Sequence, residues 1–230
     1  MSTSPARTWM WGDDAEPLRR TLSRGGVLVV PTESSYALAV DPCNQEGVLA
    51  VFRMKRRAAD QPLPVVVGSP AMIPGLGLEL PADGLGGLER AWPGALSILL
   101  RCTTEIPAAA GSRHLAVRVP GHERLTALLC ELGCALTATS ANRSGEQPML
   151  AAHEAHELVD GEDAMIVDDG RLAGGEPSTL VALGPEGPVV LRQGRVGREQ
   201  LEQLAPQWAP QWEQQWFSAA PVEIPVEESR

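Results

Sequence analysis

Short apolar runs recur along this chain, and each has the length of a β-strand. The longest include Val27–Val30 and Leu96–Leu100, whereas a helix needs about 20 apolar residues to cross a bilayer. Segments with helical spacing of apolar residues lie between these runs. Strands that alternate with helices, interleaved with hairpins, predict an α/β (α+β) fold in which helices pack on a mixed β-sheet. No membrane partner is expected.

Caps, turn residues and apolar patterns set the expected elements. We expect helices from Asp13 or Asp14 to Gly25–Gly26, from Asn44 to the basic segment 53–57, and over His122–Leu132 and Ala151–Val159. We expect strands at Val27–Val30, Leu63–Val67, Leu96–Leu100, Leu115–Val119, Ala135–Thr139, Met165–Val167, Thr179–Leu183 and Val189–Leu191. A turn at 184–187 joins the last two strands.

The net charge argues against a protein whose main task is to coat nucleic acid. The chain has 19 basic and 29 acidic residues and a formal charge of −10, and nucleic-acid binding depends on Lys and Arg that displace counterions. A local anion site stays possible, because a few convergent cations decide phosphate binding in a cleft. Neither a P-loop motif nor a G-x-S-x-G elbow occurs in the sequence.

The N-terminal sequence and the cysteines indicate the compartment. The first fourteen residues hold one arginine and no apolar segment of the secretory kind, so we expect a cytoplasmic location. Four cysteines without a C-x-x-C pair are too few for a disulfide scaffold of this size. We therefore predict buried free thiols at Cys43, Cys102, Cys130 and Cys134.

Lys55 is the single lysine among nineteen basic residues. Such usage suggests a place where a compact ammonium is needed and a planar guanidinium is not, although chance would also explain one lysine. Lys55, Arg56 and Arg57 stand at a predicted helix end, just before Gln61 and a buried strand. These cations could satisfy the helix dipole or could grip a polyphosphate.

A second cluster has small polar residues after a predicted strand. Ser140, Asn142 and Ser144 lie within the segment 138–145, which ends in a glycine. Such residues allow close approach of a ligand and offer neutral donors to anionic oxygens, but they also suit an ordinary turn. Arg118 and Arg192 lie beside apolar runs, so each needs a partner, which could be a bound carboxylate or phosphate or an internal Asp or Glu.

The last segment differs in composition and is rich in Gln, Pro and Glu. Its three tryptophans, Trp208, Trp212 and Trp216, have helical spacing. Pro206 and Pro210 oppose a continuous helix there. Two interpretations stay open: a partly ordered tail whose tryptophans fold back on the domain, or a surface that docks a partner. We expect an N-terminal extension at 1–14, the main domain at 15–204 and a flexible tail at 205–230.

Seven ordered motifs between about residues 15 and 197 resemble the YrdC-like family. They are 25–38, Lys55-Arg56-Arg57 with Gln61-Pro62-Leu63, Trp92–Ser97, Val117–Pro120, Ser140–Gly145, Pro177–Thr179 and Leu191–Gly194. The resemblance implies a YrdC-like catalytic domain with a twisted mixed sheet, flanking helices and a concave, positively lined cavity. It also implies a threonylcarbamoyl-AMP synthase, a nucleotidyltransferase that uses ATP, L-threonine and bicarbonate, with Mg²⁺ expected on the ATP. A partner enzyme, a tRNA threonylcarbamoyl transferase, would then modify an adenosine of tRNA.

The resemblance also implies site residues. The catalytic residues would be Lys55, Arg57, Ser140 and Asn142, which would contact ATP together with Gln61 and Arg192. The threonine contacts would be Thr32, Arg118, Ala138 and Ser178. No protein-held metal site is expected.

Two other functions stay open from the sequence. One is a YciO-like paralogue that binds a nucleotide but uses another acceptor. The sequence Ser34–Leu38 resembles that branch of the family more closely. The other is a module that binds double-stranded RNA without catalysis, and even for an enzyme a weak contact with RNA is conceivable. The acidic net charge argues against the second.

Overall fold

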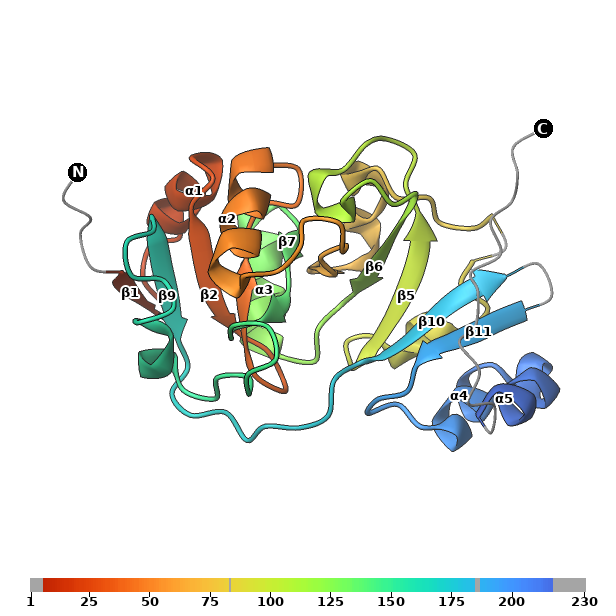
Figure 1. Cartoon of the computed structure of the whole chain (residues 1–230). Helices are drawn as coiled ribbons and strands as arrows, with labels where there is room; N and C mark the ends of the chain where they lie inside the picture. Colours follow the sequence, from red (N-terminus) through yellow and green to blue (C-terminus); the bar gives the residue numbers. More distant parts are fainter. Residues whose placement is uncertain (1–5, 83, 185–186, 217–230) are drawn as a thin grey trace.

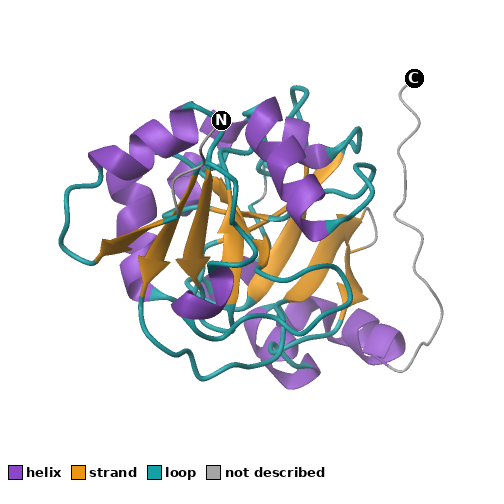
Figure 2. Cartoon of the chain, turned by 60° about the vertical axis from the view of Figure 1, so that its left-hand side comes forward, coloured by secondary structure: helices purple, strands orange, loops and turns teal. Residues whose placement is uncertain are grey.

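The computed structural model describes residues 6–82, 84–184 and 187–216, and these form two β-sheets with helices packed around them (Figures 1 and 2). The first sheet has five strands in the order β1-β9-β2-β3-β8 and the second has six in the order β11-β10-β5-β6-β4-β7. Both sheets contain parallel and antiparallel pairs. The expected class, a mixed α/β fold, is confirmed, with two mixed sheets where the sequence indicated one.

The first sheet is built around β2 (Val27–Pro31), every residue of which is buried. Its neighbours are β1 (Arg7–Met10), β9 (Ala164–Asp168), β3 (Tyr36–Ala39) and β8 (Thr139–Ser140). Val27 and Val29 belong to one hydrophobic cluster and Leu28 and Val30 to the other, because successive side chains of a strand point to opposite faces. Both faces of β2 are therefore covered, which explains its continuous apolar sequence.

Helices cover both faces of this sheet (Figure 1). On one face, α2 (Gln45–Lys55) packs Val51 and Phe52 in the cluster that contains Val27. On the other face, α1 (Glu16–Ser23) and α3 (Glu123–Leu132) pack Leu18 and Leu129 in the cluster that contains Leu28. Burial of one such side chain stabilises the fold by roughly 1.5–3 kcal/mol.

The second sheet comprises β11 (Gly187–Arg192), β10 (Thr179–Gly184), β5 (Leu96–Arg101), β6 (His114–Arg118), β4 (Val65–Val66) and β7 (Leu136–Thr137). The strand expected at Ala135–Thr139 is divided between the sheets. Its first part, β7, pairs with β4, whereas its second part, β8, pairs with β3 of the first sheet. Ala138 is the residue between them, so the chain passes from one sheet to the other at a predicted site residue.

Local signals in the sequence set the beginnings of the helices. The Asn44 side chain accepts a hydrogen bond from the Gly47 amide at 3.1 Å and caps α2, as predicted. An Asp14 carboxylate oxygen accepts from the Glu16 amide at 2.9 Å, just before α1. His122 caps α3, since its Nδ1 accepts from the amide of Leu125. Each of these side chains satisfies an amide that has no partner within its helix.

Three expectations from the sequence are wrong. The segment Ala151–Val159 is not an α-helix: it forms one 3₁₀ turn at Ala152–Ala155. The strand at Leu63–Val67 is reduced to Val65–Val66. The four cysteines are free, as predicted, but they are not buried: Cys43 and Cys130 are exposed, and Cys102 and Cys134 are partly exposed. The remaining 3₁₀ turns are Pro70–Met72, Pro74–Leu76, Leu88–Ala91, Pro107–Ala109 and Pro206–Trp208.

The C-terminal segment forms α4 (Arg198–Leu204) and α5 (Ala209–Trp216). Pro210 lies in the first turn of α5, where a helix tolerates proline. Trp212 is fully buried, its ring lies edge-on to that of Trp208 at 6.4 Å, and its Nε1 donates to the Ala205 carbonyl. The tail therefore folds back through Trp212, while the Trp216 side chain and residues 217–230 lie outside the described residues.

The division into an extension, a catalytic domain and a tail stays a prediction. Residues on both sides of its boundaries contact the main sheets. Strand β1, from the expected extension, pairs in parallel with β9. Within the described ranges, no helix has the length and apolar character that a membrane span requires.

Candidate active site

Lys55, the last residue of α2, directs its ammonium into the interior. The residue is 3% exposed, and its Nζ donates to the carbonyl oxygens of Ser140 at 2.5 Å and Asn142 at 3.1 Å and to Oδ1 of Asn142 at 2.7 Å. An ammonium has three N–H donors, so these contacts engage all of them. The helix end therefore does not hold a solvated cation at this position.

The segment that faces Lys55 is a closely hydrogen-bonded turn after β8. The Ser140 hydroxyl donates to Oδ1 of Asn142 at 2.7 Å, and Nδ2 of Asn142 donates to the Glu146 carbonyl at 2.6 Å. The Ser144 amide donates back to the Lys55 carbonyl at 3.0 Å. The ammonium thus supports the backbone and side-chain geometry of this turn, and we call Lys55, Ser140 and Asn142 the lysine cluster.

The environment of Lys55 also changes its proton affinity. Burial lowers the pKa of Lys55 to about 8, and the positive charge of Arg57 adds to this effect. Desolvation disfavours the charged form of an amine, and a neighbouring cation acts in the same direction. Lys55 is therefore a group whose charge changes just above neutral pH.

Arg57 and Gln61 lie on the loop that follows α2. Nε of Arg57 donates to Oε1 of Gln61 at 2.7 Å, and Gln61 is exposed whereas Arg57 is partly buried. This contact brings two of the expected ATP-binding side chains together. Burial lowers the pKa of Arg57, but the group stays a cation at neutral pH.

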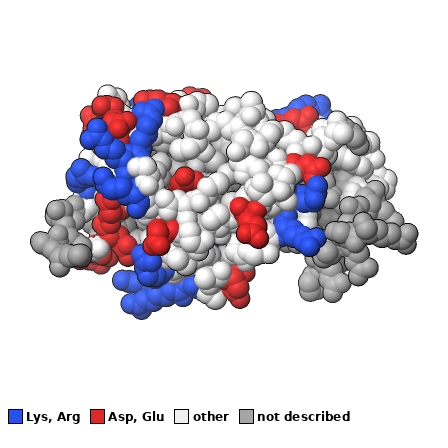
Figure 3. Space-filling view, turned by 90° about the horizontal axis from the view of Figure 1, so that it is seen from above, with Lys and Arg blue, Asp and Glu red and all other residues white. Residues whose placement is uncertain are grey.

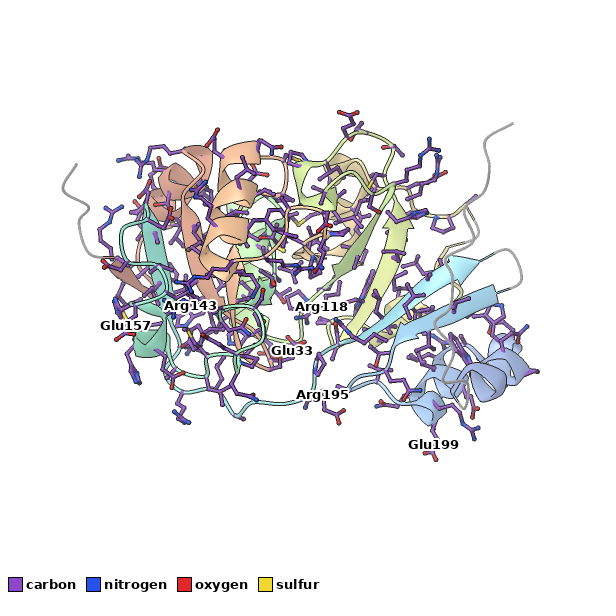
Figure 4. All side chains as sticks on the ribbon, viewed as in Figure 1. Glu33, Arg118, Arg143, Glu157, Arg195 and Glu199 are labelled. Atoms are coloured by element: carbon purple, nitrogen blue, oxygen red, sulfur yellow. The ribbon has the colours of Figure 1, made fainter. Side chains whose placement is uncertain are left out.

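Arg118, at the end of β6, forms an ion pair with Glu33, which lies on the loop between β2 and β3 (Figure 4). Nη1 of Arg118 donates to Oε1 of Glu33, and the two side chains are 11% and 14% exposed. The partner of Arg118 in this structure is therefore an internal carboxylate, one of the two possibilities that the sequence left open. The pair joins the first sheet to the second.

Thr32 and Ala138 are two further residues expected to contact threonine, and each is hydrogen-bonded within the chain. The Thr32 hydroxyl is held by its own loop, since it donates to the Ser35 carbonyl at 2.7 Å and accepts from the Ser34 and Ser35 amides. The Ala138 amide donates to the Pro64 carbonyl at 2.7 Å. Thr32 and Glu33 are consecutive, which brings the Thr32 loop next to Arg118.

Ser178 and Arg192 form a further contact at the ends of β10 and β11. Nη2 of Arg192 donates to the carbonyl of Ser178 at 3.0 Å and contacts its Oγ at 3.2 Å, while that hydroxyl lies 2.9 Å from the hydroxyl of Ser97. Partial burial and the positive charge of Arg118 lower the pKa of Arg192. The positive charge of Arg118 therefore acts on Arg192 and disfavours its protonated form slightly.

Seven of the ten predicted residues form hydrogen bonds with another of the ten, whereas Thr32, Arg118 and Ala138 bond to residues outside this set. The lysine cluster forms one group, Arg57 with Gln61 a second, and Arg192 with Ser178 a third. Arg118 is paired with Glu33, next to Thr32, and interacts electrostatically with Arg192. Ser140 pairs with Ala37 of β3, three residues beyond the β2–β3 loop residue Ser34.

A cavity of about 410 Å³ lies beside this region, between the 3₁₀ turn at Leu88–Ala91 and α4. Gly94, Ala95, Arg195 and Gln200 are among the residues that line it. None of the ten predicted site residues belongs to this lining. The expected concave cavity that would contain them stays a prediction.

Three polar contacts of the site were missed from the sequence: Glu33 with Arg118, Ser97 with Ser178, and Tyr36 with the loop after β9. The Tyr36 hydroxyl donates to the Gly170 carbonyl at 2.8 Å and accepts from the Asp169 amide at 3.0 Å. Glu33 carried a signal, because a carboxylate on a hydroxyl-rich loop is a fitting partner for an arginine beside apolar residues.

Comparison with known proteins identifies the family of this chain. The model of the Sua5_yciO_yrdC family, described as "Telomere recombination", matches residues 20–194. The chain belongs to the Sua5/YciO/YrdC family. Its match to that family covers every predicted site residue, from Thr32 to Arg192.

Two curated relatives within this family carry the name threonylcarbamoyl-AMP synthase. The protein of Bacillus subtilis is 35% identical over 185 residues, which are 79% of this chain and 53% of the relative. That of Thiobacillus denitrificans is 33% identical over 188 residues, 80% of this chain and 96% of the relative. The chain therefore spans about half the length of the first relative and nearly all of the second.

A solved structure of the same family has a similar fold. The crystal structure of Pyrococcus abyssi Sua5 complexed with L-threonine matches with a TM-score of 0.75 and 28% identity, over 87% of this chain and 61% of that chain.

Proposed function

We propose that this chain makes threonylcarbamoyl-AMP from ATP, L-threonine and bicarbonate and releases pyrophosphate. The names of its curated relatives support this activity. The observation that carries the proposal is the lysine cluster, in which the single lysine contacts residues 85 and 87 positions away in the sequence. We further propose that the protein acts in the cytoplasm and passes its product to a tRNA threonylcarbamoyl transferase.

In this proposal the contacting groups divide the substrates between them. Arg118, Thr32, Ser178 and the backbone at Ala138 hold threonine. Lys55, Arg57, Gln61, Arg192, Ser140 and Asn142 hold ATP and the carbamate. All three substrates carry negative charge, so cations must hold them together while a carbamate oxygen attacks the α-phosphorus in line and the bond to pyrophosphate breaks.

Lys55 suits the phosphate end of this site. Because its three donors are engaged within the chain, contact with a phosphate oxygen requires that one protein oxygen be exchanged for it. A charge-assisted hydrogen bond contributes about 1.5–3 kcal/mol. As charge moves onto the leaving pyrophosphate, a flexible ammonium can follow it, whereas a guanidinium held in a planar fork is less free to do so.

A protein-held Mg²⁺ does not fit the residues present. Among the residues that the structure describes, no group of three or more His, Cys, Asp or Glu side chains is arranged to hold a metal ion. Glu33 lies at the site, but it is a single carboxylate and is paired with the cation of Arg118. We propose that Mg²⁺ enters only with the triphosphate of ATP.

The proposed activity is tested by pyrophosphate release. We expect release from ATP that requires both L-threonine and bicarbonate, and mass spectrometry should identify threonylcarbamoyl-AMP as the other product. Pyrophosphate release that is indifferent to threonine would instead support a nucleotide-binding enzyme with another acceptor.

Thermal stability in the presence of ligands separates the proposals from an RNA-binding module. A ligand that binds only the folded state increases the free energy of unfolding, by about 2.7 kcal/mol when its concentration is 100 times its Kd, and therefore raises Tm. We expect a rise with ATP and a larger one with ATP and threonine together. The face seen from above is largely uncharged, with basic side chains gathered beside acidic ones at its left end (Figure 3). The net charge of −10 does not favour a module built mainly to bind RNA.

The lowered pKa of Lys55 predicts the pH dependence of this activity. With a pKa of about 8, the Lys55 side chain is a charged ammonium below about pH 8 and a neutral amine above it. The cation at the proposed phosphate site is therefore lost as pH rises. We expect kcat/KM for ATP to fall above about pH 8, by up to tenfold for each further pH unit. Pyrophosphate release measured from about pH 7 to about pH 9.5 checks this, and a level profile over that range contradicts it.

A further inference from the structure

The Glu33–Arg118 pair leaves polar groups of both signs unused. Oε1 of Glu33 accepts from Nη1 of Arg118, whereas Oε2 of Glu33 is buried and has no hydrogen-bond partner among the described residues. Of the three guanidinium nitrogens of Arg118, Nη1 alone has a hydrogen bond to another of the described residues. One free carboxylate oxygen and free guanidinium N–H groups therefore lie side by side.

A buried carboxylate oxygen without a partner is costly and is uncommon in folded proteins. The Thr32 hydroxyl on the same loop does not donate a hydrogen bond to this oxygen, because it donates to the Ser35 carbonyl and accepts from the Ser34 and Ser35 amides. A Cβ built at Gly121 would lie 3.8 Å from Cγ of Glu33, which is van der Waals contact, so the glycine leaves the stem of Glu33 without a packed side chain at this point. The buried oxygen lacks a donor, and a ligand group that reaches it would supply one.

An α-amino acid in its zwitterionic form has the complementary pair of charges. Its carboxylate matches the free N–H groups of Arg118, since guanidinium binds carboxylate in a planar fork. Its ammonium, two bonds from the carboxylate carbon, is a donor that matches Oε2 of Glu33. Both groups of the ligand would then replace water at a site where the protein side chains are 11% and 14% exposed, which strengthens both contacts.

We propose that Glu33 is the amine-binding residue of the amino-acid site, with Oε2 accepting a hydrogen bond from the substrate's α-ammonium while Arg118 binds its carboxylate. This rests on the proposed function, in which threonine is the amino acid. Glu33 then selects for a free α-amino group, the group on which a carbamate must form, and a hydroxy acid without that group binds more weakly.

Calorimetric titration of two ligands tests the proposal. L-Threonine has the amine, and 3-hydroxybutyrate keeps the carboxylate and hydroxyl but lacks it. For the wild-type chain we expect threonine to bind about 10- to 100-fold more tightly, the ratio that one charge-assisted hydrogen bond supplies. In Glu33→Gln this ratio should fall to within about threefold, because threonine weakens while 3-hydroxybutyrate does not.

Two further variants keep the result interpretable. Glu33→Asp retains the charge and is expected to retain a preference for threonine. Glu79→Gln is the matched control, because Glu79 forms an exposed ion pair with Arg101, with side chains 46% and 61% exposed, and it should leave both affinities unchanged. Circular dichroism confirms that each variant is folded.

The outcomes separate the two proposals. If the wild-type chain binds threonine and Glu33→Gln binds it equally well, the role of Glu33 is overturned and the proposed function stands. Equal weakening of both ligands in Glu33→Gln also overturns it, since Glu33 would then act only by holding Arg118. If the wild-type chain binds neither L-threonine nor glycine nor L-serine, both proposals fail.

Discussion

Lys55→Arg is expected to lower kcat/KM for ATP roughly 100-fold, although the positive charge is kept. The ammonium of Lys55 lies 2.5–3.1 Å from three oxygens of Ser140 and Asn142, in a space where the residue is 3% exposed. A guanidinium is larger and planar, so it cannot present three converging donors to these oxygens. The turn that carries Ser140 and Asn142 would shift, and the proposed contacts with phosphate would be lost with it.

Arg53→Lys is the matched control for this prediction. Arg53 lies on the same helix, and its exposed side chain pairs with Glu162 at 3.5 Å, so a lysine can replace it there. Threonine-dependent pyrophosphate release is measured for both variants, with Tm as a check on folding. Wild-type activity in Lys55→Arg would show that the compactness of the ammonium has no role and that the single lysine of this chain is a coincidence of composition.

Arg118→Met is expected to raise KM for threonine at least 100-fold while KM for ATP changes by less than about threefold. It should also destabilise the fold, by about 3–5 kcal/mol, because Glu33 is left as a buried charge without its partner. Reduced activity in this variant alone could therefore reflect partial unfolding. Denaturant unfolding of the single variant measures that contribution.

The double variant Arg118→Met with Glu33→Gln separates stability from binding. Both charges are removed, so most of the lost stability should return, whereas the loss of threonine-dependent activity should persist. Arg101→Met removes the arginine of an exposed pair with Glu79 and should change stability by no more than about 0.5 kcal/mol. Recovery of threonine-dependent turnover in the double variant would contradict the roles of both Arg118 and Glu33 in binding threonine.

The sequence predicted those elements that local residues determine. Strand β2 lies where the four consecutive apolar residues Val27–Val30 predicted a strand, and α2 follows Asn44, whose side chain caps the Gly47 amide. The glycine after α1 adopts φ = +76°, a conformation that marks the end of the helix. Signals of this kind need no knowledge of distant partners.

Elements that depend on tertiary contacts were harder to predict from the sequence. Strand β1 has no strand pattern in its sequence, and it is extended because it pairs with β9, from Arg7 with Met165 to Met10 with Asp168. The segment after Ala151 has helical spacing, yet it ends after one turn. Glu154 accepts from the Leu150 and Ala151 amides at the start of that turn, and the chain must then turn back to enter β9.

The candidate site shows the same division. The basic and hydroxyl motifs could be selected from the sequence by their residue types, and the structure brings Lys55 to Ser140 and Asn142. The sequence could not decide whether Arg118 faces a ligand or an internal acid, because Glu33 is 85 residues away and reaches it only through the packing of two sheets.

The position of β9 between β1 and β2 in the sheet constrains the order in which this chain can fold. Both of these early strands can pair with it only after the chain has been made beyond Ala164, where β9 begins. During synthesis at about 5–20 residues per second, the edges of β1 and β2 stay open for roughly ten seconds or more after they leave the ribosome. Pairing across so long a stretch of chain is slow, and an open strand edge is a template for association with other chains. Until β9 has been made, the edges of β1 and β2 that it later covers stay exposed to pairing with other chains.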